Sequence, residues 1–170
     1  MIELEQAVRD KYRQITCKLI EKHLSITTME SCTAGLLASL LTDTEGSSAV
    51  IKGAFVTYCN EAKVMQGVPA SVIDGFGVYS VETAREMALA AKRAYGADIS
   101  VGVTGTMGNA DPANSDSTPG EVFFAIAHGD KTELFCLKIP CQETRFEYKL
   151  LVADAIADKL IDMLYYRLVI

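Results

Sequence analysis

In three stretches of the chain, apolar residues recur mostly at steps of three or four, the spacing of a helix that buries one face. They cover residues 3–23, about 80–95 and about 143–165. The predicted inward positions are Leu4, Val8, Tyr12, Ile15 and Leu19; Val81, Ala84, Met87, Ala88, Ala91 and Tyr95; and Phe146, Leu150, Ala153, Ile156, Leu160 and Leu164. Ser80 is a typical N-cap for the second of these helices.

Shorter β-prone runs alternate with the helices and predict strands over residues 25–29, 50–58, 98–104, 121–127 and 132–139. The run 98–104 has little polar interruption, which predicts cover on both of its faces. The turn 128–131 predicts a hairpin, so the sheet would be mixed. Helices before, between and after the strands predict a single α/β domain: a three-layer α/β/α sandwich around a mixed, mostly parallel sheet.

Polar segments follow three of the predicted strands, and ligands of open α/β sheets bind beyond such strand ends. These segments are residues 30–35, 58–63 and 104–109. The first leads into a helix over 36–41, and a short helix over 60–65 is expected with Asn60 as its cap. The loop 46–48 precedes a strand, but it can fold over the same ligand-binding edge of the sheet. The long polar loop 105–119 is of a kind that is often functional.

The composition argues against several classes of partner, location and cofactor. In its 170 residues, 16 Lys and Arg stand against 22 Asp and Glu, and the net charge of −6 argues against a nucleic-acid or anionic-membrane surface. The charged amino end is unlike a secretion signal, and no apolar run approaches the ~20 residues of a membrane span. Five cysteines without a C-x-x-C pair suggest reduced thiols and a cytoplasmic location. No zinc-ligand spacing is present, and the scattered acids Asp111, Asp116 and Glu121 do not fit a calcium-binding EF-hand loop, so the sequence gives little support for a metal site.

Ser31 is a candidate nucleophile, because a strand-to-helix turn can expose its hydroxyl beside unpaired backbone amides that would stabilise an oxyanion. The alternative is that Ser31 caps the helix that follows. Cys32 is a second possible nucleophile, or simply a small buried side chain. The turn lacks the Gly-x-Ser-x-Gly spacing of the α/β-hydrolases.

Lys63 is the candidate base. Neither His23 nor His128 follows a strand on the expected active side, so a Ser-His-Asp triad is not indicated. A lysine acts as a base only where burial or a nearby positive charge lowers its pKa. Tyr58 offers a phenol in the same segment. The alternative is a solvated lysine on a helix surface.

Several separated motifs, in the same order, resemble the CinA carboxy-terminal domain family, also known as nicotinamide mononucleotide deamidases. The matching stretches are Glu30–Gly35 (ESCTAG), Gly46–Ser48, Gly53–Lys63 (GAFVTYCNEAK), Gly67–Val68, Gly77–Ser80, Met87–Ala88, Thr104–Gly105 and Pro119–Gly120. The resemblance covers the chain from about Leu4 to Leu164 and is closest to the stand-alone form, without the family's amino-terminal molybdopterin-binding-like domain.

The resemblance implies a Ser/Lys amidohydrolase that converts nicotinamide mononucleotide (NMN) and water to nicotinate mononucleotide and ammonia. Ser31 would be the nucleophile, Lys63 the base and Tyr58 an assistant, with no metal or organic cofactor. The expected substrate-binding residues are Cys32, Thr33, Gly35, Ser47, Ser48, Thr104, Gly105, Asn109 and Arg145. Arg145 matches a family arginine that can reach a phosphate, either within the chain or across a dimer interface, and it can equally be a surface charge at a helix start.

One segment departs from the family pattern. After Thr104 and Gly105 the family usually continues with a Gly-x-Ala-Gly-Pro-type run, whereas this chain has TMGNADP over residues 106–112, and Lys149 stands in place of a second family arginine. Asn109 and Asp111 can contact ribose hydroxyls or be turn residues. The alternatives are therefore a non-catalytic pyridine-nucleotide-binding or regulatory protein, and an amidohydrolase of another small amide.

A homodimer is the expected assembly, because oligomers of chains this size are most often two-fold dimers. The chain end 164–170 is apolar, so it can pack in the core or cover a partner subunit.

Overall fold

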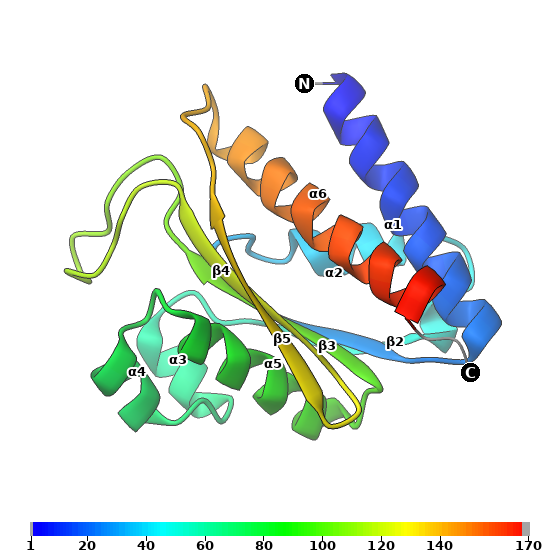
Figure 1. Cartoon of the computed structure of the whole chain (residues 1–170), viewed down its shortest axis with the longest axis horizontal. Helices are drawn as coiled ribbons and strands as arrows, with labels where there is room; N and C mark the ends of the chain where they lie inside the picture. The colour runs from blue at the N-terminus through cyan, green and yellow to red at the C-terminus, as the bar shows by residue number, and fades with distance from the viewer. Residues whose placement is uncertain (1, 168–170) are drawn as a thin grey trace.

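Five strands form one sheet in the order β2-β1-β3-β4-β5 (Figure 1). The structure is a computed structural model, and it describes residues 2–167. The strands are β1 (Ile26–Glu30), β2 (Ile51–Val56), β3 (Ile99–Gly105), β4 (Glu121–His128) and β5 (Lys131–Lys138). β1 is parallel to β2 and β3, whereas β4 is antiparallel to both of its neighbours, so it alone opposes the other strands. The predicted mixed, mostly parallel sheet and its hairpin are confirmed.

Helices cover both faces of this sheet (Figure 1). On one face lie α1 (Ile2–Lys22), α2 (Leu36–Thr42) and α6 (Arg145–Asp162); on the other lie α3 (Asn60–Met65), α4 (Ala70–Phe76) and α5 (Val81–Tyr95). A 3₁₀ turn, η1 (Ser47–Ala49), precedes β2, and a π-helical turn, η2 (Met163–Arg167), follows α6. Every residue of β3 is buried, as expected for a strand between two helical layers. The predicted three-layer α/β/α sandwich is confirmed.

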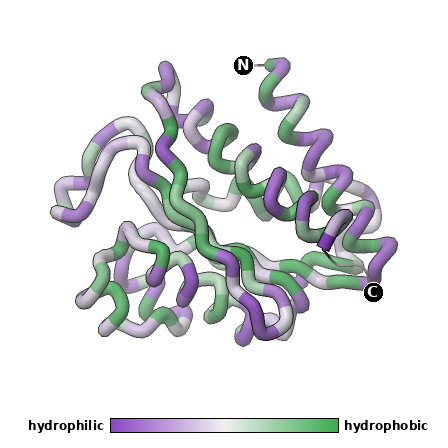
Figure 2. The backbone as a smooth tube through the Cα atoms, in the orientation of Figure 1, coloured by the Kyte–Doolittle hydropathy of each residue, from purple (hydrophilic) through white to green (hydrophobic). Residues whose placement is uncertain are grey.

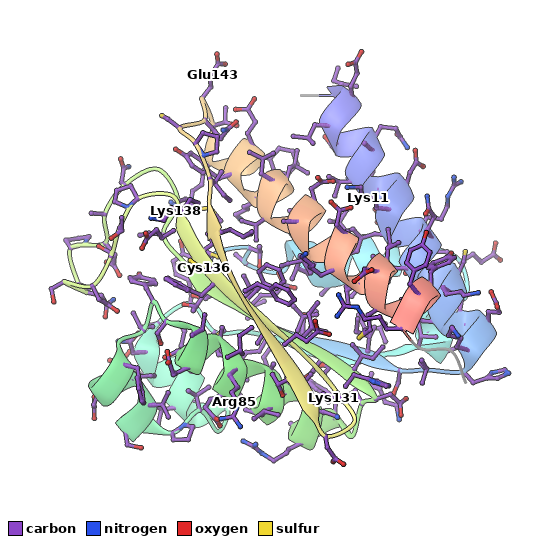
Figure 3. All side chains as sticks on the ribbon, viewed as in Figure 1. Lys11, Arg85, Lys131, Cys136, Lys138 and Glu143 are labelled. Carbon is purple, nitrogen blue, oxygen red and sulfur yellow. The ribbon has the colours of Figure 1, made fainter. Side chains whose placement is uncertain are left out.

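The larger core lies between the sheet and the helices α1, α2 and α6. The inward positions predicted for α1 and α6 are buried, apart from Leu4, which is half-buried, and Phe146, which is 39% exposed. The prediction for Phe146 is wrong because Tyr148 fills the core at that end of α6, where its ring packs against Gly108. Lys11 lies between α1 and α6 (Figure 3), and it pairs with Asp154 and Asp158 of α6.

The other face is covered mainly by α5, whose small residues allow a close approach to the sheet. The Ser80 hydroxyl accepts a hydrogen bond from the Thr83 N–H, which confirms the predicted N-cap. Ala84 and Ala88 face β3 so closely that a Cβ on Gly102 would lie 2.2 Å from the Ala84 carbonyl oxygen. Glycine is therefore required at position 102 for this packing.

One local prediction is wrong, and one helix was not predicted. Asn60 is not the cap of α3: Cys59 occupies that position, and the Asn60 amide donates instead to Asn114 Oδ1 at 3.0 Å. The helix α4 was not predicted, because its seven residues begin directly after Pro69, include Gly75 and carry no apolar repeat long enough to be recognised.

The chain end is only partly described. Leu164 is buried in the core, which places the start of the apolar tail there, while residues 168–170 lie outside the described residues. Across residues 2–167, none of the helices is both long and apolar enough to cross a membrane.

The outer strand β5 and the β3–β4 loop are the more polar parts of the sheet layer. Lys131 and Lys138 stand at the two ends of β5, with Cys136 exposed between them (Figure 3). Charged residues on an edge strand disfavour pairing with another sheet. Figure 2 shows the loop between β3 and β4 as a mainly hydrophilic or neutral excursion beyond the apolar centre of the sheet.

Candidate active site

A cavity of about 510 Å³ lies beyond the carboxyl ends of the parallel strands β1, β2 and β3. It is lined by residues 31–32, 58–61, 63, 78–79, 105–107, 109–114 and 145. All three polar segments that were predicted to follow strand ends reach it, as expected for an open α/β sheet. Of the predicted site residues, the cavity brings together Ser31, Cys32, Tyr58, Lys63, Gly105, Asn109 and Arg145.

The centre of the cavity is a buried serine–lysine pair. Lys63 Nζ lies 3.2 Å from Ser31 Oγ and donates a second hydrogen bond to the Thr57 carbonyl at 3.0 Å. Only 1% of Lys63 and 6% of Ser31 is exposed. Lys63 is therefore not a solvated helix lysine. Ser31 does not cap α2, because Gly35 occupies the N-cap position.

Burial shifts the pKa values of two side chains in this cavity, Lys63 and Cys32. Loss of solvation lowers the pKa of Lys63 from its ordinary value of 10.5, and acidic groups nearby, including Asp111 and Glu61, oppose part of that shift. Burial also raises the pKa of the Cys32 thiol to about 12. Cys32 thus stays a neutral thiol on the cavity wall, and Ser31 is the stronger candidate nucleophile.

The turn that presents Ser31 is held by the carboxylate of Glu30, which is fully buried. Glu30 accepts five hydrogen bonds, from the hydroxyls of Thr28 and Thr33 and from the backbone N–H groups of Gly35, Leu37 and Ala38. The acid thus satisfies the amino end of α2, where a negative charge is also favourable. The expectation that these amides are unpaired is wrong.

Four residues that were expected to bind substrate lie away from the cavity. Thr33 and Gly35 bond to Glu30 and do not line the cavity. Ser47 and Ser48 lie before β2, where Ile26 N bonds to the Val50 carbonyl at the amino ends of the strands, so they stand at the opposite end of the sheet.

Thr104 is also turned away from the cavity. It is fully buried, and its hydroxyl donates to the Val78 carbonyl at 3.0 Å. Gly105, the next residue, does line the cavity and has a φ of +155°. A Cβ there would lie 2.6 Å from the Glu121 carbonyl oxygen, so the turn out of β3 requires glycine.

Arg145 reaches the cavity from the start of α6, within the same chain. Its Nη2 donates a hydrogen bond of 2.9 Å to the Tyr58 hydroxyl. Tyr58 is 60% exposed, and in the described part of the chain its hydroxyl bonds neither Ser31 nor Lys63. The pair therefore places a cation and a phenol at the open side of the cavity.

Sequence reasoning missed several residues of the cavity wall. Tyr79 enters from the segment before α5, and Asn60 and Asn114 are joined across the cavity. Thr106 is 5% exposed, and its hydroxyl has no hydrogen-bond partner among residues 2–167. Tyr79 could have been found from its place in the stretch 77–80, which matches the family. Thr106 and Asn114 of the β3–β4 loop belong to no motif that would single them out.

Fold and site together define a three-layer α/β/α protein with a buried serine–lysine pair at the carboxyl ends of its parallel strands. The chain belongs to the CinA C-terminal domain family, whose model matches residues 9–164.

The relatives agree with this assignment. A "CinA-like protein" of Leptospira borgpetersenii is 41% identical over 125 residues, which are 73% of this chain and 29% of that protein. A "Putative competence-damage inducible protein" of Symbiobacterium thermophilum is 43% identical over 110 residues, 64% of this chain and 26% of that protein. The chain thus spans less than a third of the length of these curated relatives.

Solved structures share the fold over nearly the whole chain. The competence/damage inducible protein CihA of Agrobacterium tumefaciens has a TM-score of 0.83 at 31% identity, covering 92% of this chain and 94% of that one. A CinA superfamily protein of Escherichia coli has a TM-score of 0.83 at 25% identity, covering 92% and 90%. These likenesses confirm the predicted fold class.

Proposed function

We propose that this protein hydrolyses the carboxamide of NMN to give nicotinate mononucleotide and ammonia. The observation that carries the proposal is the 3.2 Å contact between the buried Lys63 Nζ and Ser31 Oγ. A lysine can act as a base only where its neutral form is accessible, and burial favours that form. Membership of the CinA C-terminal domain family supports the same class of reaction.

The first half of the reaction forms an acyl-enzyme. Neutral Lys63 takes the Ser31 hydroxyl proton while Ser31 Oγ attacks the carboxamide carbon, which gives a tetrahedral oxyanion. The oxyanion collapses, the C–N bond breaks, and Lys63 returns the proton to the leaving nitrogen, which departs as ammonia. The nicotinoyl group is then an ester of Ser31.

The second half uses the same base on water. Neutral Lys63 takes a proton from a water molecule, whose oxygen attacks the ester carbon. The C–O bond to Ser31 breaks, the proton returns to Ser31 Oγ, and the carboxylic acid product ionises as it leaves. The pyridinium ring withdraws electrons from the carboxamide throughout, which makes its carbon more electrophilic.

The oxyanion needs donors that are not already bonded. Because Glu30 holds the amides of Gly35, Leu37 and Ala38, the proposed donor is the Cys32 N–H, which bonds no acceptor of another residue within the described chain. The Thr106 hydroxyl, which also has no hydrogen-bond partner among the described residues, is proposed as a second contact of the substrate carboxamide.

Arg145 is the proposed phosphate contact, because a guanidinium offers paired donors to phosphate oxygens. Thr33, Ser47 and Ser48, which were also expected to bind substrate, do not line the cavity. Tyr58 stays a proposed assistant of proton transfer, and its hydrogen bond to Arg145 gives it a defined place at the cavity.

The purified protein is expected to release ammonia and nicotinate mononucleotide from NMN in equal amounts, measured by an enzyme-coupled ammonia assay and by chromatography. Neutral aliphatic amides serve as comparison substrates. Hydrolysis of these amides but not of NMN would contradict the substrate assignment.

A second candidate is a nucleotide-binding protein without turnover, and the altered segment 106–112 favours it. Calorimetric titration separates the two candidates. Binding of NMN by the folded protein without product would support the second and contradict the first.

The pH profile of kcat/KM is expected to rise with pH and to level off below pH 10.5. Lys63 acts as a base only in its neutral form, and burial lowers its pKa from 10.5, so more of it is neutral at a given pH than for a solvated lysine. The measurement is kcat/KM over the pH range in which circular dichroism is unchanged. A profile still rising at pH 10.5 would contradict a depressed pKa of the base.

A further inference from the structure

The loop between β3 and β4 is tied to two separate walls of the cavity. Asn114 Oδ1 accepts from the Asn60 amide of α3 at 3.0 Å. Asp111 Oδ2 accepts from the Tyr79 hydroxyl at 2.7 Å, and Asp116 Oδ2 accepts from the Tyr79 N–H at 3.1 Å. These three bonds hold the loop across the site. Asp111 lies in the segment 106–112, in which the chain departs from the family pattern.

Asp111 is the anchor of this loop. Besides Tyr79, its carboxylate accepts from Asn114 Nδ2 at 2.6 Å and from the Ala113 N–H at 2.9 Å. Three donors favour the ionised form, and the bond from Tyr79 is the main cause of a lowered pKa of Asp111. The carboxylate is therefore a fixed negative charge, and Asp111 lines the same cavity as Ser31 and Lys63.

The charges of the cavity do not balance when Lys63 is neutral. Its other charged side chains are then Glu61, Asp111 and Arg145, two carboxylates against one guanidinium. Glu61 is exposed in the first turn of α3, and backbone hydrogen bonding is the main cause of its lowered pKa. Asp111 is the carboxylate held on the loop that crosses the site.

We propose that Asp111 is a specificity-determining residue that selects substrates whose amide-bearing ring is a cation, such as an N-substituted pyridinium carboxamide. The inference rests on the proposed function and assigns a role to a residue of the altered loop. A preorganised charge attracts a cationic ring without reorganising when the ring binds, and it gives no such gain to a neutral ring. Arg145 remains available for a phosphate on the same ligand.

The test compares two ligands that differ in ring charge: NMN, whose ring is a pyridinium, and its reduced 1,4-dihydro form, whose ring is neutral. Binding is measured by calorimetry in the Ser31→Ala variant, so that no turnover interferes. We expect this variant to bind NMN on the order of tenfold more tightly than the reduced form. Adding Asp111→Asn, which keeps an acceptor for Tyr79, is expected to bring the ratio of the two affinities close to one.

The matched control is Asp116→Asn in the same background, since Asp116 is on the same loop but does not line the cavity, and asparagine keeps a carbonyl oxygen to accept from the Tyr79 N–H. It removes the same charge from the protein and is expected to leave the ratio unchanged. An unchanged ratio in Asp111→Asn, or loss of the preference in Glu61→Gln instead, would overturn the inference. So would equal binding, or no binding, of both ligands by Ser31→Ala itself.

Failure of the proposed reaction gives a different result. If the unmodified protein does not hydrolyse NMN but Ser31→Ala prefers the charged ring through Asp111, the reaction is wrong and the selectivity stands. Thermal unfolding of each variant, followed by circular dichroism, establishes that the affinities compare folded proteins.

Discussion

Replacing Lys63 with methionine is expected to lower kcat/KM for amide hydrolysis on the order of 10²- to 10⁴-fold, the usual contribution of a positioned general base. Methionine has a similar length and fills the buried space without an amine. Only 1% of Lys63 is exposed, so solvent cannot readily supply another base at Ser31 Oγ. The measurement is ammonia release under saturating and limiting NMN.

Ser31→Ala is expected to cause a loss of similar size, and the double variant to be no slower than the slower single variant. Two residues that act as one unit give such non-additive effects. The matched control is Lys52→Met, which removes an exposed lysine of β2 outside the cavity and is expected to keep full activity. Activity within about threefold of the unmodified protein in Lys63→Met or Ser31→Ala would contradict the mechanism.

The layered fold could be predicted from the sequence because its signals are local and repeated. The apolar spacing of α1 and α6 and the uninterrupted run of β3 each specify an element and its buried face. Short elements escape this reasoning: α4 has seven residues and no repeat that separates it from a loop.

The site was predicted in part, for a physical reason. That Ser31 and Lys63 follow strand ends is readable from the order of polar and apolar runs. The burial of Lys63 is not, because it depends on which groups the folded chain brings around the amine, among them the Thr57 carbonyl, which accepts one of its hydrogen bonds. Glu30 shows the same limit: an acid at the end of a strand resembles any other polar turn residue until its five donors are seen around it.

Glu30→Gln is expected to destabilise the protein by about 3–5 kcal/mol, because one carboxylate oxygen is replaced by an NH2 group, which donates hydrogen bonds and cannot accept them. Whichever oxygen is replaced, at least one backbone N–H among Gly35, Leu37 and Ala38 then faces another donor in a buried site. The favourable charge at the amino end of α2 is lost as well. The measurement is the free energy of unfolding from urea titration, followed by circular dichroism.

The matched control is Glu45→Gln, the same substitution at an exposed position of the loop that follows α2, expected to change the free energy of unfolding by less than about 0.5 kcal/mol. Glu30→Gln should also lower amide hydrolysis at temperatures where the variant is still folded, since the turn it holds carries Ser31 next to Lys63. If Glu30→Gln is as stable as the control, the hydrogen bonds of Glu30 do not hold the turn, and the position of Ser31 must be fixed chiefly by its own bond from N–H to the Val103 carbonyl.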